Sequence, residues 1–178
     1  MATAATLLSF EEFLALPEVP GVKRERWEGE LVEMGNGRFA HEFVKANIAE
    51  ILTTTARPAG FRVYSETMYR MAGESDLIPD VSLLSRSANV EASGYPDFPV
   101  LAVEVVSSET AAQLERKVGL YLNGGSVAVL VVYPSTRSIR LYRRDGSAQR
   151  LDAGQALTLP ELFPNWSCPV ESIFEGLS

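Results

Sequence analysis

Two runs of hydrophobic residues dominate the pattern of the chain and predict the centre of its fold. Residues 99–106 contain one charged residue and residues 127–133 contain none, a composition typical of strands buried on both faces of a sheet. Between them, residues 109–122 place apolar side chains at helical spacing, and the glycines at 124 and 125 end the helix. A strand, a helix and a second buried strand in this order form a right-handed crossover, so we expect the two strands to be parallel neighbours.

Weaker periodicities predict the remaining elements. Apolar positions at helical spacing indicate a helix over residues 39–55. Ser9, with Glu12 three residues later, forms a capping box for a short helix over residues 9–16. Alternation predicts strands over residues 27–34, 61–70, 77–84 and 138–143. The segment 157–174 combines three prolines with large apolar residues, so we expect it to wrap the core irregularly.

These elements predict a mixed α/β fold in which a central sheet is flanked by helices. We expect one domain over residues 1–178, in which residues 1–20 form a helical appendage and residues 152–178 form the irregular wrap. The composition is that of an ordinary globular protein, because 46% of the 178 residues are hydrophobic and 22% are charged. By size scaling, a chain of this length buries roughly 70% of its unfolded surface without help from disulfides or structural metals.

The same composition excludes several classes of protein. Cys168 is the one cysteine, which excludes an intrachain disulfide framework and a thiolate zinc cluster. The N-terminus reaches Glu11 and Glu12 before any long apolar run develops, so it does not read as a secretory signal. No run reaches the roughly 20 apolar residues that a membrane-spanning helix requires. We therefore expect a soluble, cytoplasmic protein without a membrane partner.

Two carboxylates in strand-like segments are the strongest candidates for chemistry. Glu104 is the only charged residue of the central run 99–106, and a buried carboxylate needs a cation or another partner. Asp80 follows Pro79 at the start of another strand-like run, where proline fits a strand start or bulge that re-aims a side chain. Together they offer two hard oxygen ligands of the kind that Mg²⁺ uses. For Glu104, a buried salt bridge to an arginine is the structural alternative.

Three further residues are candidates for the same site. Lys117 lies about 60° from the apolar Leu114 on the helical wheel, at the border of the buried face, where its ammonium could reach a phosphate. The alternative is a lysine that extends along the helix edge into solvent. His41, the only histidine, lies on the core-facing side of its helix and is a possible supporting residue or a structural one. Glu66 is a weaker supporting candidate.

The net charge of −7 argues against nucleic-acid binding, because phosphate contacts normally come from a basic face. A local basic patch can still exist in an acidic protein. Five arginines fall within residues 137–150, of which Arg137 and Arg140 are weak candidates for contacts with DNA. The alternative for these arginines is a solvated hairpin.

The order of motifs resembles the Uma2 family of restriction endonucleases over about residues 10–174. The segments that carry the resemblance are Arg24-Glu25-Arg26-Trp27-Glu28-Gly29-Glu30-Leu31-Val32-Glu33-Met34, a helix starting at His41, Pro79-Asp80-Val81, Val103-Glu104-Val105-Val106-Ser107, Arg116-Lys117 with Tyr121, and residues 129–134. The resemblance implies the restriction-endonuclease-like core of the PD-(D/E)XK class. It implies that Asp80 and Glu104 are the acidic metal ligands and that Lys117 is the catalytic lysine, moved onto the helix. Val106 stands where the general pattern has that lysine.

The leading hypothesis is therefore an endodeoxyribonuclease that uses Mg²⁺ or Mn²⁺ to hydrolyse DNA phosphodiester bonds. Asp80, Glu104 and the carbonyl of Val105 would hold the ion, and Lys117 would orient water or offset charge on the phosphate. One alternative is an inactive nuclease-fold domain that binds nucleic acid or a partner protein, and another is a hydrolase of a smaller phosphate ester. A homodimer is expected, since cutting both strands benefits from two symmetry-related sites.

Overall fold

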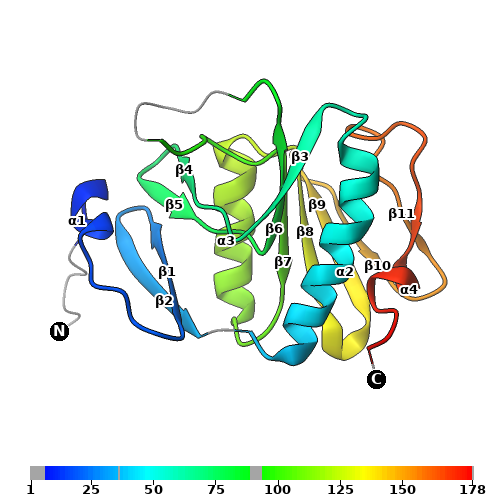
Figure 1. The fold of residues 1–178 in the computed structure, drawn as a ribbon, viewed down its shortest axis with the longest axis horizontal. Coiled ribbons are helices and arrows are strands. Elements are labelled where there is room, and N and C mark those ends of the chain that lie inside the picture. The colour runs from blue at the N-terminus through cyan, green and yellow to red at the C-terminus, as the bar shows by residue number, and fades with distance from the viewer. Residues whose placement is uncertain (1–6, 36, 89–93, 178) are drawn as a thin grey trace.

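A six-stranded mixed sheet forms the centre of the protein (Figure 1). The computed structural model describes residues 7–35, 37–88 and 94–177. The strands follow the order β10-β9-β8-β7-β6-β3. Their bounds are β3 (Phe61–Ser65), β6 (Val81–Ser85), β7 (Leu101–Val105), β8 (Ala128–Tyr133), β9 (Ser138–Arg143) and β10 (Ala148–Leu151). The expected parallel pairing of the two apolar strands is confirmed by β7 and β8, and the other pairs of this sheet are antiparallel.

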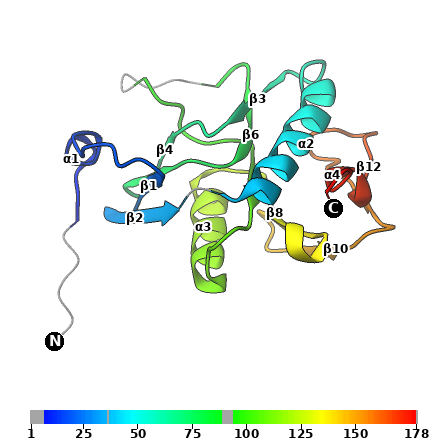
Figure 2. The same ribbon diagram turned by 60° about the horizontal axis from the view of Figure 1, so that its bottom comes forward.

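Two helices cover the two faces of this sheet, as Figures 1 and 2 show. Helix α2 (Phe39–Ala56) packs its buried side chains against Leu101, Val103 and Val105 of β7. Helix α3 (Ala111–Gly124) packs on the opposite face, against Ala102. Because side chains alternate along a strand, Glu104 shares the α3 face with Ala102. The fold is therefore the mixed α/β arrangement that the hydrophobic pattern predicts.

A smaller antiparallel sheet, in the order β2-β1-β5-β4, lies on the side of α3 (Figure 2). Its strands are β1 (Val22–Trp27), β2 (Glu30–Gly35), β4 (Tyr69–Met71) and β5 (Ser75–Leu77). The strand predicted over residues 27–34 is β2, but it begins only at Glu30, because Glu28 and Gly29 adopt positive φ angles of 52° and 86° and form a hairpin turn after β1. The strand predicted over residues 61–70 ends at Ser65, before Glu66 with its φ of 51°. The strand predicted over residues 77–84 is two strands with Pro79 between them.

The two ends of the chain contribute to the core. Helix α1 (Phe10–Leu14) has the predicted capping box between Ser9 and Glu12, but it buries Phe10 and Phe13. The short helix η1 (Pro134–Thr136) precedes β9. The C-terminal segment contains β11 (Ala156–Leu157), β12 (Cys168–Pro169) and α4 (Val170–Ile173). Its large apolar residues pack into the core on the α2 side of the sheet. No helix within the described residues is both long enough and apolar enough to cross a membrane.

The turn between β1 and β2 should be sensitive to a single methyl group. Gly29→Ala forces a Cβ into the positive-φ region and against the Leu7 side chain, whose Cβ would lie 3.2 Å away. We expect a loss of about 1–2 kcal/mol in the free energy of unfolding, measured by urea denaturation. Gly35→Ala is the matched control, because a Cβ there meets nothing within 4 Å. Equal effects of the two substitutions would contradict this account of the turn.

Candidate active site at the ends of β6 and β7

The register between β6 and β7 places the two predicted carboxylates opposite each other. Val81 pairs with Val103 in antiparallel order, so Asp80, one residue before Val81, faces Glu104, one residue after Val103. The Oδ2 atom of Asp80 accepts a hydrogen bond of 2.8 Å from the backbone N–H of Val105. Both side chains are buried, with 3% of each residue exposed. The two acids therefore share one buried location.

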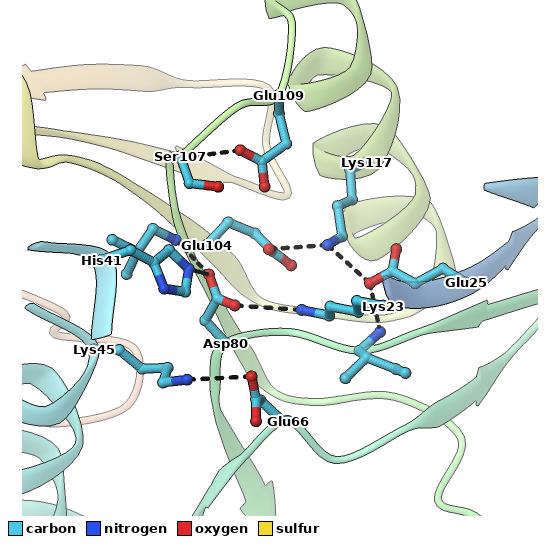
Figure 3. Close-up of polar contacts among 12 residues, drawn as sticks. Lys23, Glu25, His41, Lys45, Glu66, Asp80, Glu104, Ser107, Glu109 and Lys117 are labelled. Atoms are coloured by element: carbon cyan, nitrogen blue, oxygen red, sulfur yellow. Dashed lines mark hydrogen bonds and ion pairs between the residues drawn. The ribbon is translucent and has the colours of Figure 1, made fainter. Parts of the chain in front are cut away.

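Asp80 is held by two cationic partners from different elements (Figure 3). The Nε2 atom of His41, in the first turn of α2, lies 3.0 Å from Asp80 Oδ2, and the Nζ atom of Lys23 in β1 lies 3.3 Å from Oδ1. Burial alone would raise the pKa of Asp80, but the hydrogen bond from His41 and the charges of Lys23, His41 and Lys117 outweigh it. The pKa of Asp80 is therefore held well below its ordinary value, and the group stays ionised.

Lys117 and Tyr121 of α3 hold the carboxylate of Glu104. The Nζ atom of Lys117 lies 2.9 Å from Glu104 Oε2, and the Tyr121 hydroxyl donates to Glu104 Oε1 at 2.7 Å. Burial alone would lower the pKa of Lys117, but the charges of Glu104, Glu25 and Asp80 raise it far above its ordinary value. Lys117 is thus a buried, permanently charged ammonium that points toward the acids.

Glu25 is a member of this cluster that the sequence reasoning did not include. Its Oε1 lies 2.9 Å from the Nζ of Lys117 and accepts from the N–H of Ile78 at 2.9 Å, and its Oε2 accepts from the Trp27 indole at 2.6 Å. Glu25 is fully buried. The missed signal is the hairpin turn after Trp27. Once β1 ends at that turn, strand alternation puts Lys23, Glu25 and Trp27 on one face.

The buried cluster carries more acids than fully buried cations. Glu25, Asp80 and Glu104 are three buried carboxylates, whereas the buried cations are Lys117 and His41, and Lys23 is partly exposed. Burial raises the pKa of Glu104 to about 7; Lys117 opposes this rise, and the charges of Asp80 and Glu25 add to it. An additional cation would relieve this excess of negative charge, so the donor set fits a divalent metal ion.

The number of protein ligands favours an ion that keeps its own water. In residues 7–35, 37–88 and 94–177, no group of three or more His, Cys, Asp and Glu side chains is arranged to hold a metal. The site offers the two carboxylates of Asp80 and Glu104. Mg²⁺ is commonly bound through one or two carboxylates while it retains several waters.

Asp80 opens onto a cavity of about 370 Å³, whose walls also include His41, Lys23, Lys45 and Glu66. Glu104 and Lys117 lie behind Asp80 and do not line this cavity. The predicted supporting residue Glu66 is exposed at the rim, where its carboxylate lies 3.1 Å from the Nζ of Lys45. Both lysines of this cavity are thus paired with carboxylates, Lys23 with Asp80 and Lys45 with Glu42 and Glu66.

The two predicted arginines lie apart from these acids. Arg137 lines a neighbouring cavity of about 510 Å³ that shares His41 and Ser107 with the first, and its guanidinium donates to the carbonyl of Leu177. Arg140 lines neither cavity and lies 5.6 Å from the centre of the Tyr133 ring. The structure thus brings together Asp80, Glu104, Lys117 and His41, and leaves Arg140 outside the group.

The His41–Asp80 pair should be visible in the titration of the histidine. Burial alone would lower the pKa of His41, but the hydrogen bond and charge of Asp80, reinforced by Glu42, raise it above the ordinary value. Because His41 is the only histidine, its pKa can be measured by NMR without assignment. We expect Asp80→Asn to lower that pKa by about one pH unit or more, whereas Asp152→Asn at the surface should not change it. An unchanged His41 pKa in Asp80→Asn would contradict the pairing.

The raised pKa of His41 makes the stability of the fold depend on pH. A pKa raised by folding means that the protonated imidazole stabilises the fold below about pH 6.5, and this contribution is lost as the pH rises through the folded-state pKa. The difference in urea midpoint between wild type and His41→Gln should therefore be larger at about pH 5.5 than at about pH 8.5.

Comparison with known proteins places the chain in a family. The fold is similar to the crystal structure of a protein from Anabaena variabilis ATCC 29413 described as "a putative nuclease belonging to DUF820", with 18% identity and a TM-score of 0.81 over 94% of this chain and 97% of that chain. A weaker likeness, with 18% identity and a TM-score of 0.44, covers 75% of this chain and 12% of a chain in a structure described as "cryoEM structure DrdV-DNA complex". No curated protein sequence matches the chain. Residues 10–171 match the model of the Uma2 family, described as "Putative restriction endonuclease", and the chain belongs to that family.

Proposed function

We propose that the protein is a Mg²⁺- or Mn²⁺-dependent endodeoxyribonuclease that hydrolyses DNA phosphodiester bonds at the Asp80–Glu104 site. The observation that carries the proposal is the pair of buried carboxylates facing each other across β6 and β7. Membership of a family described as "Putative restriction endonuclease" supports the reaction class. A symmetric homodimer would supply two such sites for the two DNA strands.

Asp80, Glu104 and the carbonyl of Val105 would hold the ion. When bound, a divalent ion supplies Lewis-acid polarisation of the phosphate and a water of lowered pKa. The excess of buried carboxylates supports this assignment, because the protein's own cations leave the pKa of Glu104 raised to about 7.

The lysines of the cavity would bind the substrate. Lys23 and Lys45 are partly exposed and line the space in front of Asp80. An ammonium is a compact charge with rotatable donors, which suits a phosphate oxygen whose position varies along a strand. Lys23 would move from Asp80 to the phosphate, since a cation at Asp80 would repel it, and Lys45 would exchange Glu42 and Glu66 for the phosphate.

Lys117 would act behind the acids rather than on the substrate. Only 2% of it is exposed, and its ammonium is shared between Glu104 and Glu25. In that position it fixes the orientation of Glu104 and offsets negative charge that builds up at the site. Glu25, anchored by the Trp27 indole and the Ile78 amide, would fix Lys117 in turn.

A second function is favoured by one observation. All four carboxylate oxygens of Asp80 and Glu104 already have protein partners, namely Lys23, His41 and Val105 for Asp80, and Lys117 and Tyr121 for Glu104. Such a closed network suits a nuclease-fold domain that binds nucleic acid or a partner protein without cleaving. Absence of Mn²⁺ binding at millimolar concentration would favour this function over the nuclease.

Cleavage and metal binding should depend on both acids. We expect wild type to cut single-stranded, duplex or branched DNA in the presence of Mn²⁺ or Mg²⁺. Asp80→Asn and Glu104→Gln should each lower the cleavage rate by on the order of 10² or more and abolish Mn²⁺ binding measured by calorimetry. Asp152→Asn, an exposed acid paired with Arg150, is the matched control and should behave as wild type. Cleavage at the wild-type rate by Asp80→Asn would rule out this site.

Lys117 should matter for both folding and rate. Replacing it with Met leaves two buried carboxylates without their shared cation, so we expect the free energy of unfolding to fall by about 3–5 kcal/mol. Adding Glu104→Gln to Lys117→Met should recover part of this loss, because the two residues are coupled. In the folded fraction, the cleavage rate should fall by on the order of 10² or more while Mn²⁺ affinity stays equal or rises slightly. A folded Lys117→Met protein that cleaves as fast as wild type would exclude the lysine from the mechanism.

A further inference from the structure

A third cavity, of about 450 Å³, lies at the end of α2 opposite to His41. Three arginines line it, Arg57, Arg62 and Arg86, and all three are exposed. They come from separate segments: Arg57 follows α2, Arg62 is in β3, and Arg86 follows β6. The N–H of Arg86 donates to the carbonyl of Gly60 at 3.0 Å, which ties the third segment to the turn between the first two. We call this group the arginine cleft.

Among residues 7–35, 37–88 and 94–177, the arginine cleft has no acidic counterpart. Within the residues that the structure describes, no carboxylate lies within ion-pair distance of its three guanidinium groups. By contrast, Arg143 and Arg150 of the β9–β10 region are each paired at 2.8 Å, with Glu161 and Asp152. In a chain with a net charge of −7, three gathered cations without an acid repel one another, and an anion would relieve that repulsion.

The arginine cleft and the candidate active site lie near opposite ends of α2. At 100° per residue, the helix turns by 160° between His41 and Arg57, so α2 does not present both sites on one side. His41 and Lys45 line the cavity of Asp80, whereas Thr53 and Arg57 line the arginine cleft. The twelve residues from Lys45 to Arg57 span about 18 Å at 1.5 Å per residue.

Strand β3 connects the two cavities. It lies beside α2 and runs from Phe61 near the arginine cleft to Ser65 (Figure 1). The next residue, Glu66, contacts Lys45 at the rim of the Asp80 cavity. A linear polyanion whose one phosphate lies at Asp80 can therefore follow β3 to the three arginines.

We propose that the arginine cleft binds the phosphodiester backbone of duplex DNA, about five nucleotides from the scissile phosphate at 3.4 Å per nucleotide. This inference rests on the proposed function and adds a second contact to it. Guanidinium groups suit the role because their planar donors match phosphate oxygens in pairs. Near Asp80 and Glu104, carboxylates would neutralise positive charge. The arginine cleft supplies positive charge away from these carboxylates.

The test measures DNA binding without cleavage. Wild type and Arg57→Gln/Arg62→Gln/Arg86→Gln are titrated against a labelled duplex of about 30 base pairs in EDTA, at several salt concentrations. We expect the triple variant to bind at least about tenfold more weakly at low salt. The slope of log K against log salt should become shallower by about 1–3, because each lost phosphate contact removes about 0.9.

The matched control removes the same charge elsewhere. Arg24→Gln/Arg143→Gln/Arg150→Gln changes three arginines that are each paired with an acid, and it should leave both affinity and salt slope near the wild-type values. Equal losses in the two triple variants, equal binding by the arginine-cleft variant and wild type, or no binding of DNA by wild type would each overturn the inference. If wild type binds DNA and never cleaves it, the proposed reaction fails while the effect of the cleft is still measured.

Inorganic phosphate is the other anion that the arginine cleft could bind. Inorganic phosphate, compared with chloride at equal ionic strength, should displace the duplex no better than chloride does. Saturable displacement of the duplex from wild type, but not from the arginine-cleft variant, by sub-millimolar phosphate would identify a site for small anions and overturn the assignment to the DNA backbone.

Discussion

The antiparallel register of β6 and β7 places Asp80 and Glu104 opposite each other in the interior, and the surrounding elements supply groups that compensate their charge. Helix α2 contributes His41, β1 contributes Lys23, and α3 contributes Lys117. Each of these elements packs on the central sheet or beside it through apolar residues, but each also brings one cation to the same point. Two ionised carboxylates in a low-dielectric interior would otherwise cost several kcal/mol apiece. The charged pair therefore constrains how both layers are placed against the sheet.

The surrounding cations compensate the charges of Asp80 and Glu104 only in part. This partial compensation links stability to function. Asp80 has enough partners to keep its pKa low, whereas burial and the neighbouring acids raise the pKa of Glu104 to about 7. A core selected for stability alone would place an apolar residue at position 104 and need neither Lys117 nor Glu25. A cation that binds only the folded state relieves the repulsion and stabilises the protein by mass action. In the proposed function, the local cost to the fold and the affinity for a metal would have one cause.

Strong local patterns were sufficient to predict the central part of this arrangement. The parallel pair β7 and β8 follows from two apolar runs around a helix, and Glu104 stands out as the one charge in the first run. The direction of Lys117 follows from helical periodicity. The small sheet could not be predicted in the same way, because its β1–β2 turn uses Glu28 at a positive φ, which few glutamates adopt. Lys23 and Glu25 were missed with it, since their common face depends on where β1 ends.

Whether a basic residue is available to an anion depends more on its own ion pairs than on the net charge of the protein. The sequence draws attention to the arginines of residues 137–150, yet Arg143 and Arg150 are paired with acids and Arg137 donates to a backbone carbonyl. The arginines at 57, 62 and 86 are scattered along the chain, so no run of basic residues marks them, and they meet only because β3 pairs with β6 beside the end of α2. A net charge of −7 counts paired and unpaired groups alike. The potential that a polyanion meets is set by the unpaired ones, because an adjacent carboxylate cancels most of a guanidinium's field within a Debye length.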